Sequence, residues 1–152
     1  DMNKARIAIL ALSALTAASA LAVGTQTPSD VHKDKASYNG YVNRELTAAI
    51  NSADKASNAK DVTAIHQNLR EVLNCLAGQG QPGYDPSIQD PCRRMGRGAL
   101  VDITPDSDEH RLVTQAFNEA KNGLSQTTVD SARDLASKAL NDLENAQKDT
   151  EQ

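Results

Sequence analysis

The chain has 152 residues, a formal net charge of −4 and a pI near 5.3, and 39% of its residues are hydrophobic although only 3% are aromatic. This length suits a single domain. The few aromatic residues and the 23 alanines favour closely packed helices over a sheet, and the acidic balance argues against nucleic-acid binding, which needs a basic surface.

Residues 1–22 have the pattern of an export signal. A positively charged start and an apolar stretch at 7–17 precede Ala20-Leu21-Ala22, which matches the small-x-small sequence that signal peptidase recognises. The sequence therefore predicts a periplasmic or otherwise exported protein, with a single mature domain of residues 23–152. The alternative is an inner-membrane anchor, since the segment is about long enough to span a bilayer if it is retained.

Four stretches of the mature chain carry apolar residues at the three- and four-residue steps of an amphipathic helix. They lie within residues 42–56, 62–76, 113–124 and 129–146. Short breaks separate the first stretch from the second and the third from the fourth. Asp61 is the candidate N-cap after the first break, and Thr127 or Thr128 is the candidate after the other. Connections this short predict two antiparallel helical hairpins.

The two predicted hairpins are similar in sequence. Residues 46–76 align without a gap with residues 113–143, and eight of the 31 aligned positions are identical. Since neither hairpin can bury its apolar face alone, we predict an all-α fold, an antiparallel four-helix bundle built from two repeated hairpins. The hairpins are expected at about 30–77 and 106–148. A crossover that makes the second and third helices parallel stays open.

The connection at 78–105 is rich in Gly and Pro and predicts a linker without helical periodicity, with the second hairpin beginning after Thr104-Pro105-Asp106. Cys75 and Cys92 are the only cysteines. An even number in an exported chain predicts a disulfide, which would staple the linker to the preceding helix. A segment this long in a small domain is usually functional or disordered, so the linker is the predicted site.

Arg93, Arg94 and Arg97 form a cationic cluster in this linker, on an otherwise acidic chain. We interpret the cluster as a docking site for an acidic partner or for anionic headgroups, whereas the alternative is a solvated loop whose arginines pair with nearby Asp residues. No catalytic triad spacing and no phosphate loop occur. The sequence thus favours a non-enzymatic exported protein that acts as a binding or accessory subunit through its linker. A small anchored subunit of a membrane complex is the alternative if residues 1–22 are retained.

His32, His66 and His110 are the candidate metal ligands. In an up-down-up-down arrangement, His32 and His110 lie at one end of the helices and His66 lies at the other end. A crossover linker would instead bring His66 beside His110, where neighbouring carboxylates would complete a site.

The tandem Ala-rich hairpins, from about residue 36 to residue 148 of an exported chain, resemble the small metal-binding proteins of bacterial periplasms. The linker also looks like a segment of uncharacterised exported helical proteins, through the residues Asn74-Cys75-Leu76-Ala77-Gly78, Tyr84-Asp85, Pro91-Cys92 and Gly96-x-Gly98-Ala99. The resemblance implies a four-helix bundle that binds a divalent metal, copper or zinc, with His66 and His110 at helical positions where family ligands would fall. Apart from that implication, the sequence predicts no cofactor.

Overall fold

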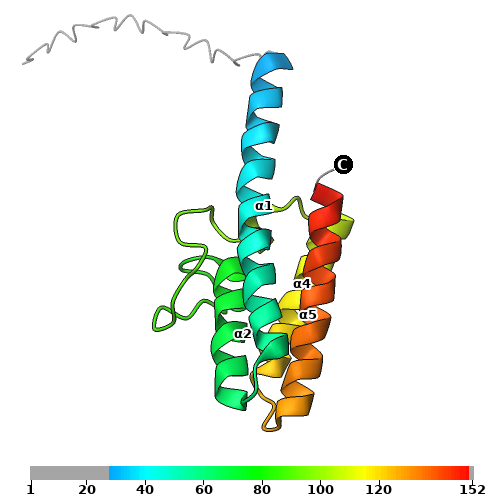
Figure 1. The fold of residues 1–152 in the computed structure, drawn as a ribbon. Coiled ribbons are helices and arrows are strands. Elements are labelled where there is room, and N and C mark those ends of the chain that lie inside the picture. The colour runs from blue at the N-terminus through cyan, green and yellow to red at the C-terminus, as the bar shows by residue number, and fades with distance from the viewer. Residues whose placement is uncertain (1–27, 151–152) are drawn as a thin grey trace, which may run out of the picture.

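The structure, a computed structural model, describes the backbone of residues 28–150 and the side chains of residues 40–150. Within this range all regular structure is helical, which confirms the predicted all-α class (Figure 1). The helices are α1 (Pro28–Asn58), α2 (Val62–Ala77), α3 (Ala99–Asp102), α4 (Asp108–Gly123) and α5 (Val129–Thr150). The short α3 lies inside the predicted linker, where no helix was expected.

The predicted export segment, residues 1–22, lies outside the described residues. Among the helices of residues 28–150, none is long and apolar enough to cross a membrane.

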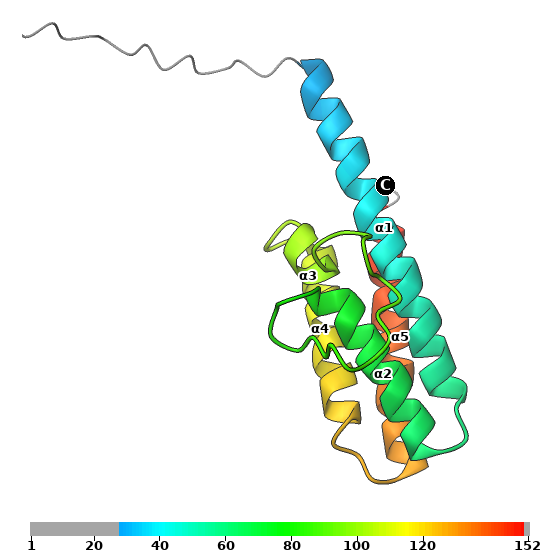
Figure 2. The ribbon, with the colours of Figure 1, turned by 90° about the vertical axis from the view of Figure 1, so that its left-hand side faces the viewer.

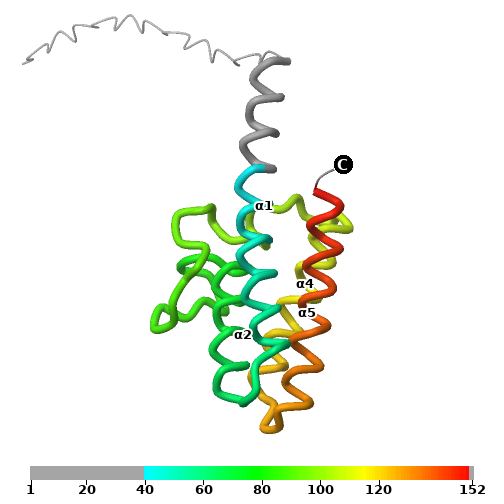
Figure 3. Tube along the Cα trace, in the orientation of Figure 1, coloured from blue at the N-terminus to red at the C-terminus, as the bar shows by residue number. Residues whose placement is uncertain are grey.

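The four long helices lie side by side, and α2 and α5 also contact each other. Helix α1 packs against α2 and α5, and α4 packs against α5 and α2. The α1–α2 and α4–α5 connections lie at the same end of the molecule, so successive long helices run in opposite directions (Figure 3). Two polar contacts between α1 and its neighbours support this arrangement. Ser52 Oγ donates to Glu71 Oε2 of α2 at 3.1 Å, and Gln147 Nε2 of α5 donates to Asn43 Oδ1 at 2.7 Å.

Side-chain caps fix the start of three helices. Asp61 Oδ1 accepts from Ala64 N at 2.8 Å at the start of α2, and Thr128 Oγ1 accepts from Ser131 N at 3.3 Å at the start of α5, as predicted. Helix α4 begins at Asp108, after Thr104-Pro105-Asp106, and its cap is Ser107. Asp106 has a φ of 64°, which lies outside the right-handed helical region, so the helix begins only after this residue.

The core between the long helices is built largely from alanine. Helix α5 contributes Ala132, Ala136, Ala139 and Ala146 together with Leu143, all fully buried. Small side chains let the helix backbones approach closely, so a chain without Trp still forms a closed core. Phe117, the single phenylalanine, is only partly buried and packs at the edge of this core.

Some positions that lie 67 residues apart along the chain are alike in burial or in their place at a helix start. Helices α2 and α5 begin at Val62 and Val129, which have this separation, and so do their caps, Asp61 and Thr128. Eight such pairs are buried in both copies. They are Leu46/Val113, Ala49/Ala116, Ala53/Ala120, Ala56/Gly123, Ile65/Ala132, Leu69/Ala136, Val72/Ala139 and Leu76/Leu143.

Candidate functional site

Residues 78–98, named here the linker loop, connect α2 to α3 and lie beside α2 (Figure 2). The predicted disulfide between Cys75 and Cys92 is confirmed, with a Cα–Cα distance of 5.1 Å. Cys75 belongs to the last turns of α2 and Cys92 to the middle of the loop. Because both residues are buried, the bond fixes the loop against the helical core rather than at the surface.

The Asn74 side chain holds a second point of the linker loop. Its Nδ2 donates to Asp85 O at 3.0 Å, and its Oδ1 accepts from Asp85 N at 2.7 Å. Asn74 is 1% exposed, so these bonds form away from water. The Asn74 amide thus satisfies both backbone hydrogen-bonding groups of Asp85, in a segment where no helix or strand does so. The loop is therefore attached to α2 at two points, Asp85 and Cys92.

The two ends of the linker loop touch through glycine backbone. Gly78 has a φ of +79° and Gly98 a φ of +104°, and a Cβ atom on Gly98 would overlap the carbonyl group of Ala77. Only glycine combines this backbone conformation with so close an approach. The contact closes the loop where it leaves α2 and where it returns to α3.

Two buried carboxyl groups bind consecutive amides at the end of the loop. Glu45 Oε1 of α1 accepts from Gly98 N at 2.9 Å, and Asp102 Oδ2 of α3 accepts from Arg97 N at 2.7 Å. A Cβ atom on Gly96 would overlap both carboxyl groups, so they converge on the same stretch of backbone. Glu45 is 1% exposed, and its Oε2 has no hydrogen-bond partner among the described residues. Sequence analysis missed Glu45, although it stands three residues after Val42, on the face that α1 buries.

Burial raises the pKa of Glu45 to about 7. The Gly98 N–H lowers this pKa, the nearby Asp102 and Asp90 carboxylates raise it, and Arg97 lowers it. In the unfolded chain the pKa returns to its ordinary value of 4.5. The folded protein therefore holds the proton more tightly, and the stability that this contributes is complete below the unfolded pKa and is lost as the pH rises through about 7.

We expect the free energy of unfolding to fall between about pH 5 and pH 8, and the Glu45→Gln variant to lose this decrease. Glutamine keeps an oxygen that accepts from Gly98 N but does not titrate. Urea unfolding at a series of pH values measures the effect, with Glu144→Gln, at an exposed position of α5, as the matched control. Equal pH dependence in the wild type and Glu45→Gln would contradict the assignment.

The structure separates the three predicted arginines into two groups. Arg97 Nε pairs with Asp102 Oδ1 at 2.8 Å, as the solvated-loop alternative expects. Arg93 and Arg94 are exposed, and neither forms an ion pair among the described residues. Arg94 has a φ of 69°, uncommon for a residue with a side chain. Two neighbouring guanidinium groups are therefore presented to solvent by an anchored loop.

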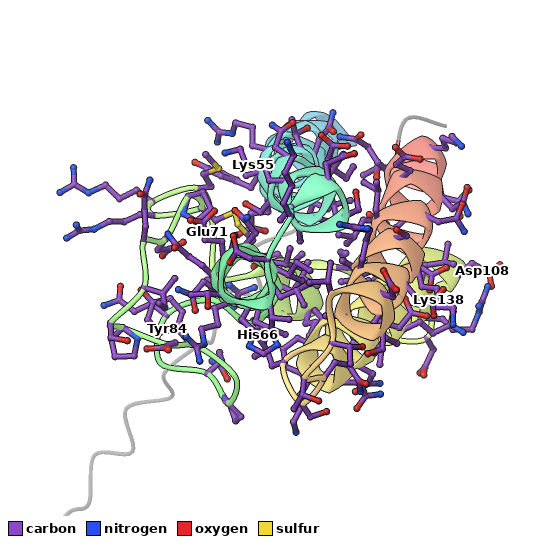
Figure 4. The ribbon with its side chains drawn as sticks, turned by 60° about the horizontal axis from the view of Figure 1, so that its bottom comes forward. Lys55, His66, Glu71, Tyr84, Asp108 and Lys138 are labelled. Atoms are coloured by element: carbon purple, nitrogen blue, oxygen red, sulfur yellow. A yellow bond between two sulfur atoms is a disulfide. The ribbon has the colours of Figure 1, made fainter. Side chains whose placement is uncertain are left out.

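A shallow groove of about 390 Å³ adjoins Arg93. Tyr84, Pro86 and Ile88 contribute its less polar part. Tyr84 lies on the loop side of α2, away from Lys138 on α5 (Figure 4), and its hydroxyl donates to Asp90 Oδ2 at 3.3 Å. Burial, and next the Asp90 charge, raise the pKa of Tyr84 above its ordinary value, so its hydroxyl stays protonated at neutral pH. The cationic pair thus stands next to a surface that combines apolar and hydrogen-bonding groups.

The structure does not bring His66 and His110 together. His66 lies in the first turns of α2, where Gln126 O of the α4–α5 connection is 3.0 Å from its Nε2. His110 lies in the first turn of α4, and the 13 residues from there to Gly123 span about 20 Å of helix. The side chain of His32 is outside the described residues. Among the described side chains no group of three or more His, Cys, Asp or Glu residues is suited to a metal ion, and copper or zinc binding stays a prediction.

No protein family, curated protein or solved structure matches the chain. The resemblance to small periplasmic metal-binding proteins therefore stays a hypothesis.

Proposed function

We propose that the protein is a non-enzymatic binding or accessory subunit that acts outside the cytoplasm and binds an acidic partner through Arg93 and Arg94. The observation that carries the proposal is the exposed arginine pair on the linker loop, which is attached through its disulfide, through Asn74 and through Glu45. A preorganised loop loses little conformational entropy when it binds. Arginine in particular pairs with carboxylates through two parallel hydrogen bonds.

The net charge of the chain restricts where an acidic partner can bind. At −4 overall, the protein would repel an acidic partner unless contact occurs at a locally cationic surface. Arg97 is exposed as well, but its Nε is already paired with Asp102 Oδ1, so Arg93 and Arg94 are the two arginines of the cluster without an ion pair among the described residues. The arginine pair then sets where and in which orientation the partner binds.

The proposed architecture is an antiparallel four-helix bundle made of two repeated hairpins. Four long helices that alternate in direction support it, and so do the helix starts, caps and buried positions that recur 67 residues apart. In this interpretation the linker loop is the part that has no counterpart in the repeat, which makes it the natural place for a function specific to the protein.

Export is proposed from the disulfide and from the sequence of residues 1–22. Disulfides persist in oxidising compartments, and Cys75 and Cys92 are fully paired here. Whether the first 22 residues are removed or retained as an anchor decides between a free subunit and a subunit of a membrane complex. Mass measurement of the chain isolated from its source distinguishes the two forms.

The test is affinity capture from an extract of the source, with the disulfide intact and bound proteins quantified by mass spectrometry. We expect the Arg93→Glu/Arg94→Glu variant to capture at least about tenfold less of the specific partner than the wild type does, because each charge reversal replaces attraction by repulsion. Added salt should weaken capture by the wild type.

The matched control is Lys55→Glu/Lys60→Glu, which makes the same change in net charge at exposed positions near the α1–α2 connection. Lys55 lies on α1, away from the linker loop (Figure 4). This control should retain the partner. A set of captured proteins that is the same for the wild type and the arginine variant would overturn the proposal.

A further inference from the structure

A second groove, of about 330 Å³, lies on a different side of the linker loop. It is bounded by α2, by the loop and by the end of α4, and it lies within the size range of small-molecule sites. Its lining residues are Arg70, Leu73, Pro82, Gly83, Asp85, Phe117, Lys121 and Leu124. We propose that this groove binds an organic carboxylate with a compact apolar body. The proposal is independent of the acidic partner, because the groove contains neither Arg93 nor Arg94.

The wall that the loop contributes is held in place by the core. The two hydrogen bonds from the buried Asn74 fix the backbone of Asp85. On the other side, Gly83 lies against the ring of Phe117, and a Cβ atom at Gly83 would come within 2.6 Å of the ring. The groove therefore exists before a ligand arrives, which is the usual condition of a small-molecule site.

The floor of the groove is apolar. Leu73 is buried, Phe117 and Leu124 are partly buried, and together they present two aliphatic side chains and one ring. At about 30 Å³ for each water of the liquid, the groove holds the volume of about eleven waters. Transfer of a short hydrocarbon chain from water onto this floor is favourable.

The rim of the groove carries a net positive charge. Arg70 of α2 and Lys121 of α4 both line it, and neither forms an ion pair within 4.0 Å in the part of the chain that the structure describes. Asp85 is the single acidic residue of the lining. Its Oδ1 accepts from Ser87 N at 2.9 Å and from Ser87 Oγ at 2.6 Å, and these bonds, followed by the Arg70 charge, lower its pKa.

Asp85 consequently stays ionised at neutral pH, and the three charged groups of the rim sum to one positive charge. A monocarboxylate balances that charge while its apolar part covers Leu73 and Phe117. A neutral chain lacks the first interaction, and a small anion without a chain lacks the second. The geometry thus points to a ligand that combines both properties.

The test compares three probes by NMR titration of the full chain, namely octanoate, octanol and acetate. We expect octanoate to shift the signals of Leu73, Phe117 and Leu124 and to bind about tenfold more tightly than either other probe. Octanol binding as tightly as octanoate would overturn the role of the charged rim, and acetate binding as tightly would overturn the role of the floor. Absence of shifts at these three residues with octanoate would overturn the site.

Variants make the test specific to the rim. Arg70→Gln/Lys121→Gln leaves Asp85 as the single charge of the rim, so octanoate should bind more weakly than octanol to this variant. Lys55→Gln/Lys60→Gln should change the affinity of neither probe. Asp85→Asn keeps the oxygen that accepts from Ser87 and removes the negative charge that competes with the ligand. It should therefore increase the affinity for octanoate and leave the affinity for octanol unchanged. Weaker octanoate binding in Asp85→Asn would contradict the charge argument. Arg93→Glu/Arg94→Glu should bind octanoate normally, which separates a failure here from a failure of the proposed function.

Discussion

Replacing both cysteines by alanine is expected to lower the free energy of unfolding by about 3 kcal/mol and the melting temperature by roughly 10 °C. The bond joins residues separated by 17 positions and restricts the unfolded chain accordingly. It also fixes Cys92, which is 7% exposed, against the core next to Glu45. Denaturant unfolding of the wild type and the Cys75→Ala/Cys92→Ala variant measures the difference.

Reduction of the wild type is the control for this experiment. It should lower stability by a similar amount, and a reducing agent should have no effect on the variant that lacks both cysteines. If the loss is below about 1 kcal/mol, the linker loop does not depend on the disulfide for its attachment. The helical content of the protein should be unchanged in either case, since the helix caps and buried helix faces do not involve the disulfide.

The Gly98→Ala substitution is expected to lower the free energy of unfolding by about 3 kcal/mol or more, because two unfavourable effects act at one position. The φ of +104° disfavours any residue with a side chain, and the added methyl group would overlap the backbone of Ala77 and Gly78. The overlap is with backbone, which cannot rotate aside as a side chain does. Separation of the loop ends would also break the bond from Gly98 N to Glu45 Oε1.

Gly80→Ala is the matched control for this substitution. Gly80 also has a positive φ, +81°, but an added Cβ atom there has no neighbour within 4 Å. Gly80→Ala should lower the free energy of unfolding by only about 1 kcal/mol, which is the contribution of backbone conformation alone. Equal losses in the two variants would show that the ends of the linker loop are not in close contact.

Much of the helical fold could be predicted because its signals are local. The apolar periodicity of each long helix and the caps Asp61 and Thr128 depend on residues a few positions apart. The disulfide could be predicted since only two cysteines occur. The break before α4 is also a local signal, since Thr104-Pro105-Asp106 directly precedes the cap Ser107 and Asp106 has a positive φ.

The attachments of the linker loop could not be predicted in the same way. Glu45 bonds to a residue 53 positions later, and Asn74 holds Asp85 across 11 positions of irregular chain. No periodicity relates such partners, so only the folded chain shows them. The same limit applies to the arginine cluster. Its three members look equivalent in sequence and all three are exposed, whereas only Arg97 forms an ion pair among the described residues.

The central claim is that the linker loop is a fixed surface and not a flexible connection between two hairpins. Hydrogen exchange of its backbone amides tests this most directly. The N–H groups of Asp85, Arg97 and Gly98 donate to side chains of buried residues at 2.7, 2.7 and 2.9 Å. They should exchange at least about a hundredfold more slowly than in an unfolded chain, while the amide of Gly80, which has no acceptor among the described residues, exchanges freely. Exchange of all four amides at unfolded rates would contradict the account.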